Sequence, residues 1–214
     1  MKLPFDPTKH GWHFPANAIA DAMGVKRSNG LCGGLTLSAV NYFRYGMNIP
    51  AIQISSEAAN TKPVFNFILY SQFAVFESAN ILKQKTALLF PNTQENHYRT
   101  SINDEFPKIE KALDDGSFVI LGLRSVKEDY KAFHQILVYG YDDNNCTLYA
   151  YDCDSPDEEV IIKSNGYRLL FSNGKDYGSY YLLMTLNSNA KSGLSNYDSS
   201  KNQANNFSVK PPEA

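Results

Sequence analysis

Cys32 is the residue of this 214-residue chain whose surroundings most favour chemistry. It lies within residues 29–34 (NGLCGG), at the first turn of a helix predicted over residues 31–45. Unpaired backbone N–H groups and the positive end of the helix dipole favour a thiolate there, which is the nucleophilic form of the side chain. The neighbouring glycines let a substrate backbone approach the sulfur closely. The alternative role for Cys32 is that of a small buried apolar residue at a helix–loop junction.

A thiolate of this kind needs a base, and His134 is the strongest candidate among the four histidines. It opens a strongly apolar strand over residues 134–141 (HQILVYGY), where an imidazole has no packing reason to lie. A structural histidine at the core edge, bonded to the backbone, is the alternative. His10, His13 and His97 lie in irregular, polar surroundings and carry less signal.

The hairpin that follows this strand supplies a candidate third residue. In an antiparallel pair, residues that lie opposite each other share a constant sum of positions. With the turn centred near Asp143, Asp152 lies opposite His134, close enough to accept a hydrogen bond and fix the imidazole tautomer. Asp154 pairs with His134 instead if the turn is centred on Asn144. Either aspartate alone is commonly a cap of a turn or of a strand end.

The elements that must position these residues are helical in the first half of the chain. Residues 1–30 predict an extended segment, and its end supplies the N-cap of the helix over residues 31–45, as Ser28 or Asn29. Two further helices are predicted where apolar residues recur at helical spacing, over residues 64–82 and 106–113.

After Gly116 the pattern becomes that of β-strands, in segments rich in β-branched and aromatic residues. The predicted strands span residues 117–125, 133–141, 147–152, 159–163 and 180–186. Helices first and strands second predict an α+β fold rather than an alternating parallel sheet. Residues 187–214, rich in Asn and Ser, predict a flexible tail or linker, so the folded domain is expected to span residues 1–186.

Three motifs of this chain resemble papain-like cysteine peptidases, most closely the bacterial peptidase C39-like group. They are residues 30–34 (GLCGG), 134–142 (HQILVYGYD) and 149–152 (YAYD). The resemblance extends over residues 11–186 and implies a papain-like fold, in which the nucleophile begins a helix that packs on a C-terminal antiparallel sheet. It implies Cys32 as nucleophile, His134 as base and Asp152 as the residue that orients the base.

The chain departs from the papain-like pattern in the donor to the oxyanion. Papain-like enzymes often carry a glutamine several residues before the cysteine, and residues 1–31 contain none. The backbone N–H of Cys32, together with a side chain such as Asn17, is the alternative donor pair. A protein that kept the fold and lost the activity would also lack the glutamine.

The predicted function is hydrolysis of a peptide, isopeptide or amide bond in a protein or peptide substrate, through a thioester on Cys32. An acyltransferase, transglutaminase or deamidase would use the same residues. A catalytically silent binding module, such as an effector or toxin domain, is the alternative of a different class. No cofactor or metal is expected, because a zinc site of Cys32, His134 and Asp152 has no CxxC or HxxxH pairing to support it.

Composition and charge narrow the class of protein. Hydrophobic residues make up 43% and charged residues 20%, which predicts a folded chain. The net charge is −2 and there is no basic run, so nucleic acid is not an expected partner. Three cysteines are too few for a disulfide scaffold. With no signal peptide or membrane-spanning run, a cytoplasmic protein is predicted, with signal-independent export or membership of a longer toxin left open and no oligomeric state assigned.

Overall fold

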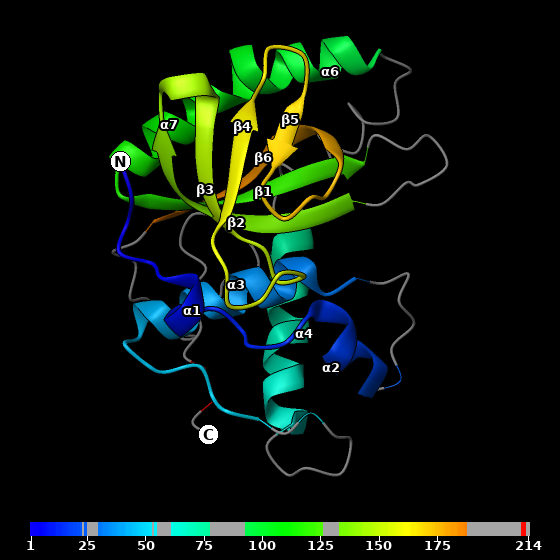
Figure 1. Ribbon diagram of the computed structural model, residues 1–214. Helices are drawn as coiled ribbons and strands as arrows, with labels where there is room; N and C mark the ends of the chain where they lie inside the picture. The colour runs from blue at the N-terminus through cyan, green and yellow to red at the C-terminus, as the bar shows by residue number, and fades with distance from the viewer. Residues whose placement is uncertain are drawn as a thin grey trace.

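The computed structural model describes residues 1–22, 24, 30–52, 54, 61–77, 93–125, 133–187 and 211–212. Helices dominate its N-terminal half, and a curled six-stranded antiparallel sheet forms its C-terminal half (Figure 1). This arrangement confirms the predicted α+β class with an antiparallel sheet.

The helices and strands have the following bounds. The helices are α1 (Pro7–His10), α2 (Ala16–Ala22), α3 (Cys32–Arg44), α4 (Thr61–Glu77), α6 (Gln94–Thr100) and α7 (Phe106–Asp114), with a π-helical turn at Ser101–Glu105 between the last two. The strands are β1 (Ser117–Ser125), β2 (Phe133–Asp142), β3 (Thr147–Tyr151), β4 (Val160–Ser164), β5 (Leu169–Phe171) and β6 (Tyr177–Asn187).

The sheet separates two hydrophobic cores. Its strand order is β5-β4-β3-β2-β1-β6, and α3 packs on one face while α7 packs on the other (Figure 1). Leu137 and Tyr139 of β2 belong to the core on the α3 side, and the alternate residues Ile136 and Val138 belong to the core on the α7 side. A central strand buried on both faces explains the nearly continuous apolar run in β2.

Two predicted helix boundaries need correction, and a third is untested. The N-cap of α3 is Leu31, which makes no side-chain capping bond, whereas residues 28 and 29 lie outside the described part of the chain. α4 begins at Thr61 rather than at residue 64, because Pro63 is tolerated within a first turn whose N–H groups have no intrahelical acceptor. The predicted continuation from residue 78 to 82 lies outside the described residues.

The predicted extended segment over residues 1–30 is wrong where α1 and α2 form. α1 is only one turn long, with Asp6 as its N-cap and Pro7 in its first turn. α6 and β5 were not predicted either, and both are too short to show a clear period. Short elements of this kind owe their stability to tertiary packing more than to local propensity.

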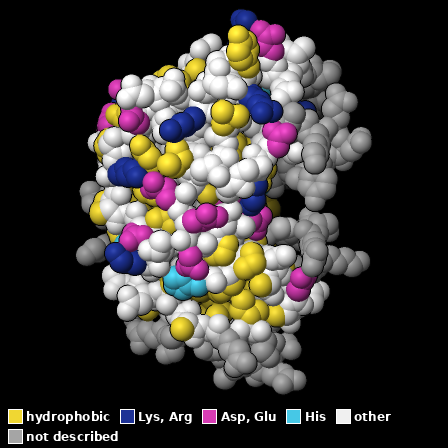
Figure 2. Space-filling view, in the orientation of Figure 1, with side chains coloured by type: hydrophobic (Ala, Val, Ile, Leu, Met, Phe, Trp, Pro, Cys, Tyr) yellow, Lys and Arg dark blue, Asp and Glu magenta, His cyan; other side chains and the backbone are white. Residues whose placement is uncertain are grey.

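Charged side chains of both signs are interspersed over the face shown in Figure 2, and no basic patch dominates it. None of the described helices is long and apolar enough to cross a membrane.

The end of the predicted tail contacts the folded domain. β6 extends through Asn187, and residues 188–210 lie outside the described part of the chain. Pro211 is buried, and the carbonyl oxygen of Pro212 accepts a hydrogen bond of 3.1 Å from the Tyr42 hydroxyl of α3. Pro211 and Pro212 therefore add packing and one hydrogen bond to the helical half.

We expect Tyr42→Phe to lower the stability of the protein by about 1 kcal/mol, because it removes this hydrogen bond without changing the aromatic packing. Such a loss lowers the melting temperature of a chain of this size by about 2–4 °C. Tyr45→Phe is the matched control, since the buried Tyr45 hydroxyl has no hydrogen-bond partner among the described residues. Thermal unfolding followed by circular dichroism measures both, and equal melting temperatures for the two variants would contradict the docking.

Candidate active site

Cys32 is the first residue of α3. The two residues that follow it, Gly33 and Gly34, lie so close to neighbouring elements that neither position has room for a side chain. A Cβ atom at Gly33 would lie 1.9 Å from Gln135 Oε1, and one at Gly34 would lie 2.3 Å from the backbone oxygen of Ile68. The glycines therefore let β2 and α4 close on the start of the helix. The Cys32 side chain is 8% exposed, and its thiol lies 3.9 Å from Gln135 Oε1, which accepts from it.

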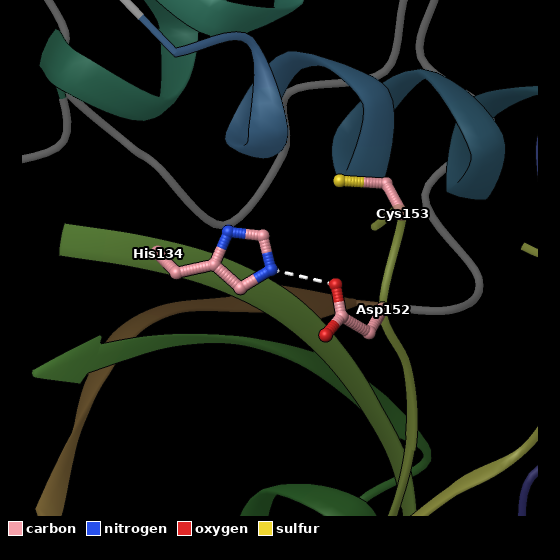
Figure 3. Close-up of side chains that lie close together, drawn as sticks. All are labelled: His134, Asp152 and Cys153. Atoms are coloured by element: carbon pink, nitrogen blue, oxygen red, sulfur yellow. Dashed lines mark hydrogen bonds and ion pairs between the residues drawn. The ribbon is translucent and has the colours of Figure 1, made fainter. Parts of the chain in front are cut away.

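His134 and Asp152 are hydrogen-bonded, with 2.6 Å between Nε2 of the imidazole and Oδ1 of the carboxylate (Figure 3). The predicted pair therefore forms, although the register argument that led to it is wrong. Leu137 pairs with Tyr151, and continuing this register would place Asp154 opposite His134. β3 ends at Tyr151 and the chain then turns, which swings the Asp152 side chain onto the imidazole.

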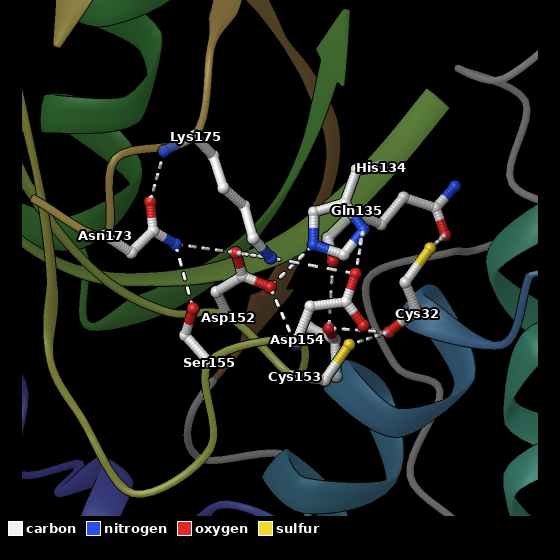
Figure 4. A network of polar contacts seen from close by, with 10 residues as sticks. Cys32, His134, Gln135, Asp152, Cys153, Asp154, Ser155, Asn173 and Lys175 are labelled. Carbon is white, nitrogen blue, oxygen red and sulfur yellow. Dashed lines mark hydrogen bonds and ion pairs between the residues drawn. The ribbon is translucent and has the colours of Figure 1, made fainter. Parts of the chain in front are cut away.

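Asp152 has donors on both carboxylate oxygens. Besides His134, the backbone N–H of Asp154 donates to Oδ1 at 2.9 Å. Asn173 Nδ2 and Lys175 Nζ, from the segment between β5 and β6, each lie 3.2 Å from Oδ2 (Figure 4). Burial alone would raise the pKa of Asp152, but the imidazole and then the Lys175 ammonium hold it well below its usual value. A carboxylate with 1% exposure thus stays ionised.

His134 is held in its protonated form. Burial lowers the pKa of the imidazole, but the Asp152 carboxylate, and after it the Cys32 side chain, more than offset this and raise the pKa to about 10. The Tyr177 ring stacks on the imidazole with 5.8 Å between centroids and 12° between planes. The ring is thus clamped beside Cys32 as an imidazolium, the partner that stabilises a thiolate.

Asp154, the alternative third residue, lies on the other side of the imidazole. Its Oδ2 is 3.9 Å from His134 Nδ1 and 3.7 Å from Lys175 Nζ. Its side chain is 40% exposed, against 1% for Asp152. The contact is longer and more solvated than that of Asp152, so we assign the orientation of the imidazole to Asp152.

Cys153 was not predicted to take part in the site, yet it lies next to it. One ligand atom each of His134, Asp152 and Cys153 fall within 4.8 Å of one another (Figure 3), a spacing that a metal ion could use. The Lys175 ammonium beside Asp152 and the proton on His134 both oppose a cation at this position. We therefore interpret these atoms as part of the Cys32 site rather than as a metal centre.

Within the described residues, the structure does not join the predicted oxyanion donor Asn17 to Cys32 by a hydrogen bond. Asn17 is exposed on α2. The remaining histidines do not join the site either: His10 packs against Phe43, His13 pairs with Asp157, and His97 contacts Arg124.

A glutamine that the sequence reasoning missed points at the start of α3. Gln72 of α4 is 3% exposed, and its Oε1 accepts from the backbone N–H of Gly34 at 2.7 Å. That bond fixes the amide orientation, and Nε2 is left buried with no partner among the described residues. Nε2 lies 3.2 Å from where a Cβ of Gly33 would be. The only signal in the sequence is a glutamine inside an apolar helix.

Comparison of the chain with protein-family models, with curated proteins and with solved structures finds no match in any of the three.

We expect Cys32 to be alkylated before the other two cysteines at neutral pH. Burial, with Glu110 and Asp143 nearby, raises the pKa of the Cys146 thiol, and burial together with Cys32 raises that of Cys153, so both stay protonated. A time course with iodoacetamide at pH 7, followed by peptide mapping, measures the order. The same reaction in urea is the control, because unfolding should bring the three rates together. Faster labelling of Cys146 or Cys153 in the folded protein would contradict the assignment of Cys32.

Proposed function

We propose that this protein is a papain-like cysteine hydrolase that cleaves a peptide, isopeptide or amide bond through a thioester on Cys32. The observation that carries the proposal is the buried His134–Asp152 pair beside a cysteine at the first turn of α3. A protonated imidazole, a carboxylate that orients it and a helix N-terminus are the groups that a thiolate nucleophile requires.

In the acylation step, the Cys32 thiolate attacks the carbonyl carbon, and the electron pair of the C=O bond moves to the oxygen. The backbone N–H of Cys32 and the unpaired Nε2 of Gln72 are the donors available to this oxyanion. When the intermediate collapses, the C–N bond breaks and the leaving amine takes the proton of His134. The products are the free amine, a thioester on Cys32 and a neutral imidazole.

In the deacylation step, His134 removes a proton from water as the water oxygen attacks the thioester carbon. The carbon–sulfur bond then breaks, which releases the carboxylic acid product and restores the thiolate and the imidazolium. Asp152 keeps the imidazole in one orientation throughout, and Asn173 and Lys175 hold Asp152 in place. An acyltransferase, transglutaminase or deamidase would share the acylation step and differ in what attacks next.

The alternative of a different class is a catalytically silent binding module that keeps this fold. It predicts that Cys32 is not acylated and that partner binding is indifferent to Cys32→Ser. The unpaired amide of Gln72 favours the enzyme, because a buried donor without a partner costs stability in a protein that has no use for it.

We expect Asp152→Asn to slow acylation of Cys32 by about 100-fold or more, because an amide favours a different hydrogen-bond arrangement of the imidazole. Asp154→Asn, the matched control on the same loop, should slow it by less than about threefold, since that carboxylate is 40% exposed and lies 3.9 Å from the imidazole. Release of p-nitrophenolate from p-nitrophenyl acetate, with the thioester located by mass spectrometry, measures both. The reverse order would transfer the role to Asp154, and a wild-type protein that is never acylated would favour the binding module.

A second prediction separates the oxyanion donor from the nucleophile. Gln72→Glu keeps the acceptor for the Gly34 N–H and removes the donor, and Gln72→Met removes both without adding charge. Acylation by the ester should fall about 10²–10³-fold in each. Alkylation of Cys32 by iodoacetamide forms no oxyanion, so its rate should stay within about threefold of wild type. Parallel losses in both reactions would mean that Gln72 only shapes the helix start.

A further inference from the structure

A second polar cluster lies where the α6 region meets the edge strand β6. The Tyr181 hydroxyl is 2.6 Å from His97 Nδ1, and Arg124 Nη1 is 2.6 Å from His97 Nε2. His97 and Tyr181 are buried, with 7% and 6% exposure. The site described above uses none of these three side chains.

The protons of this cluster can be assigned from the chemistry of arginine. Because a guanidinium only donates, Nε2 of His97 must accept from Arg124. Burial and the adjacent Arg124 lower the pKa of His97, so the ring is neutral and its one proton sits on Nδ1. That N–H donates to the Tyr181 oxygen. The hydroxyl proton of Tyr181 is therefore directed elsewhere and requires an acceptor.

Among the described residues, no free carboxylate accepts the hydroxyl proton of Tyr181. Ser179 lies on the same strand and is 1% exposed, and its hydroxyl is within hydrogen-bonding reach of the Tyr181 side chain. Glu105 lies near Tyr181, but its Oε1 binds Lys108 and its Oε2 accepts from the backbone N–H of Leu182. The cluster therefore presents a guanidinium and two hydroxyls with one positive charge, and it lacks a negative partner in the described structure.

The strand register places this cluster on the same face of the sheet as Cys32. Gly122 of β1 pairs with Gln135 of β2 on one side and with Tyr181 of β6 on the other. Residues directly opposite in antiparallel strands point to the same face, and Gln135 is the residue that contacts the Cys32 thiol. Two strand spacings separate Gln135 from Tyr181, which amounts to about 10 Å.

The next pair of residues on this face of β1 and β6 also belongs to the cluster. Arg124 pairs with Ser179, so both side chains start on the face that carries Tyr181. The residue between the two sites, Gly122, has no side chain, although Leu183 covers it at 3.0 Å. Arg124 is partly exposed, whereas Tyr181 and Ser179 are buried beside it.

We infer that Arg124, Ser179 and Tyr181 form a subsite that binds a carboxylate group of the substrate, two strand spacings or about 10 Å from Gln135, the residue that contacts the Cys32 thiol. One guanidinium with two neutral hydroxyl donors matches a single negative charge, whereas a phosphate dianion calls for more than one cation. At about 3.4 Å for each extended residue, the carboxylate belongs to an acidic residue two or three positions from the scissile bond. This inference rests on the proposed function for its substrate role, but not for the binding of the anion.

Direct binding tests the anion site without reference to catalysis. Sodium acetate and sodium phosphate are each titrated against sodium chloride at equal ionic strength, with amide NMR shifts as the readout. We expect acetate to shift amides of β1 and β6 in the wild type and in Arg99→Gln, whose arginine is exposed on α6 and pairs with Glu95. Arg124→Gln should abolish the shifts and Tyr181→Phe should weaken them. Shifts absent from the wild type, or stronger with phosphate than with acetate, would overturn the carboxylate site.

Covalent probes test the substrate role. Peptidyl vinyl sulfones that carry Glu or Gln at the second or third residue from the reactive group are compared by their rates of Cys32 labelling. In the wild type we expect about tenfold faster labelling by one of the acidic probes, the effect of one hydrogen bond to a charged group. Arg124→Gln should remove this preference, and Arg124→Lys, which keeps the charge, should retain part of it.

The outcomes of the two experiments distinguish the two proposals. Equal labelling by acidic and neutral probes overturns the substrate role and leaves the hydrolase standing. If no probe labels Cys32, the proposed hydrolase fails and the substrate role fails with it, while the acetate titration still decides whether the anion site exists.

Discussion

The site depends on the hydrogen bond between Asp152 and His134, in which the charged Asp152 carboxylate is only 1% exposed. A buried carboxylate is tolerated only when its oxygens are saturated with donors and a positive charge is near. Three separate segments meet this need: β2 supplies His134, the turn after β3 supplies a backbone N–H, and the segment before β6 supplies Asn173 and Lys175. These segments all bind the Asp152 carboxylate. The carboxylate is therefore fixed in place, and it orients the His134 imidazole.

The same demand for close packing governs the start of α3. The helix meets the sheet and α4 where residues 33 and 34 carry no side chains, which brings two glutamine amides to the residue that follows Cys32. One amide oxygen satisfies a first-turn N–H that the helix itself cannot satisfy. The other amide contacts the thiol. The helix N-terminus therefore has one side-chain cap, which comes from the distant Gln72 and not from its own N-cap residue.

Both proposals depend on one face of the sheet. The row from Gln135 through Gly122 to Tyr181 is continuous across three strands, so a group bound at β6 is held at a distance set by strand spacing. A rigid sheet is well suited to measure such a distance, since strand separation varies far less than loop geometry. The edge position of β6 matters too, because its free edge is covered by Ser101 and Glu105 rather than by another strand.

The sequence by itself determined that helices precede strands and marked Cys32 and His134, with Asp152 and Asp154 as candidate partners, because period and residue type at element ends are local properties. It could not determine which aspartate meets the imidazole. A register shift between Val138 and Gly140 favours Asp154, and only the turn after Tyr151, with donors from more than twenty residues away, decides for Asp152. Gln72 and Lys175 were invisible for the same reason: each acts through contacts between distant segments, and such contacts leave no period in the chain.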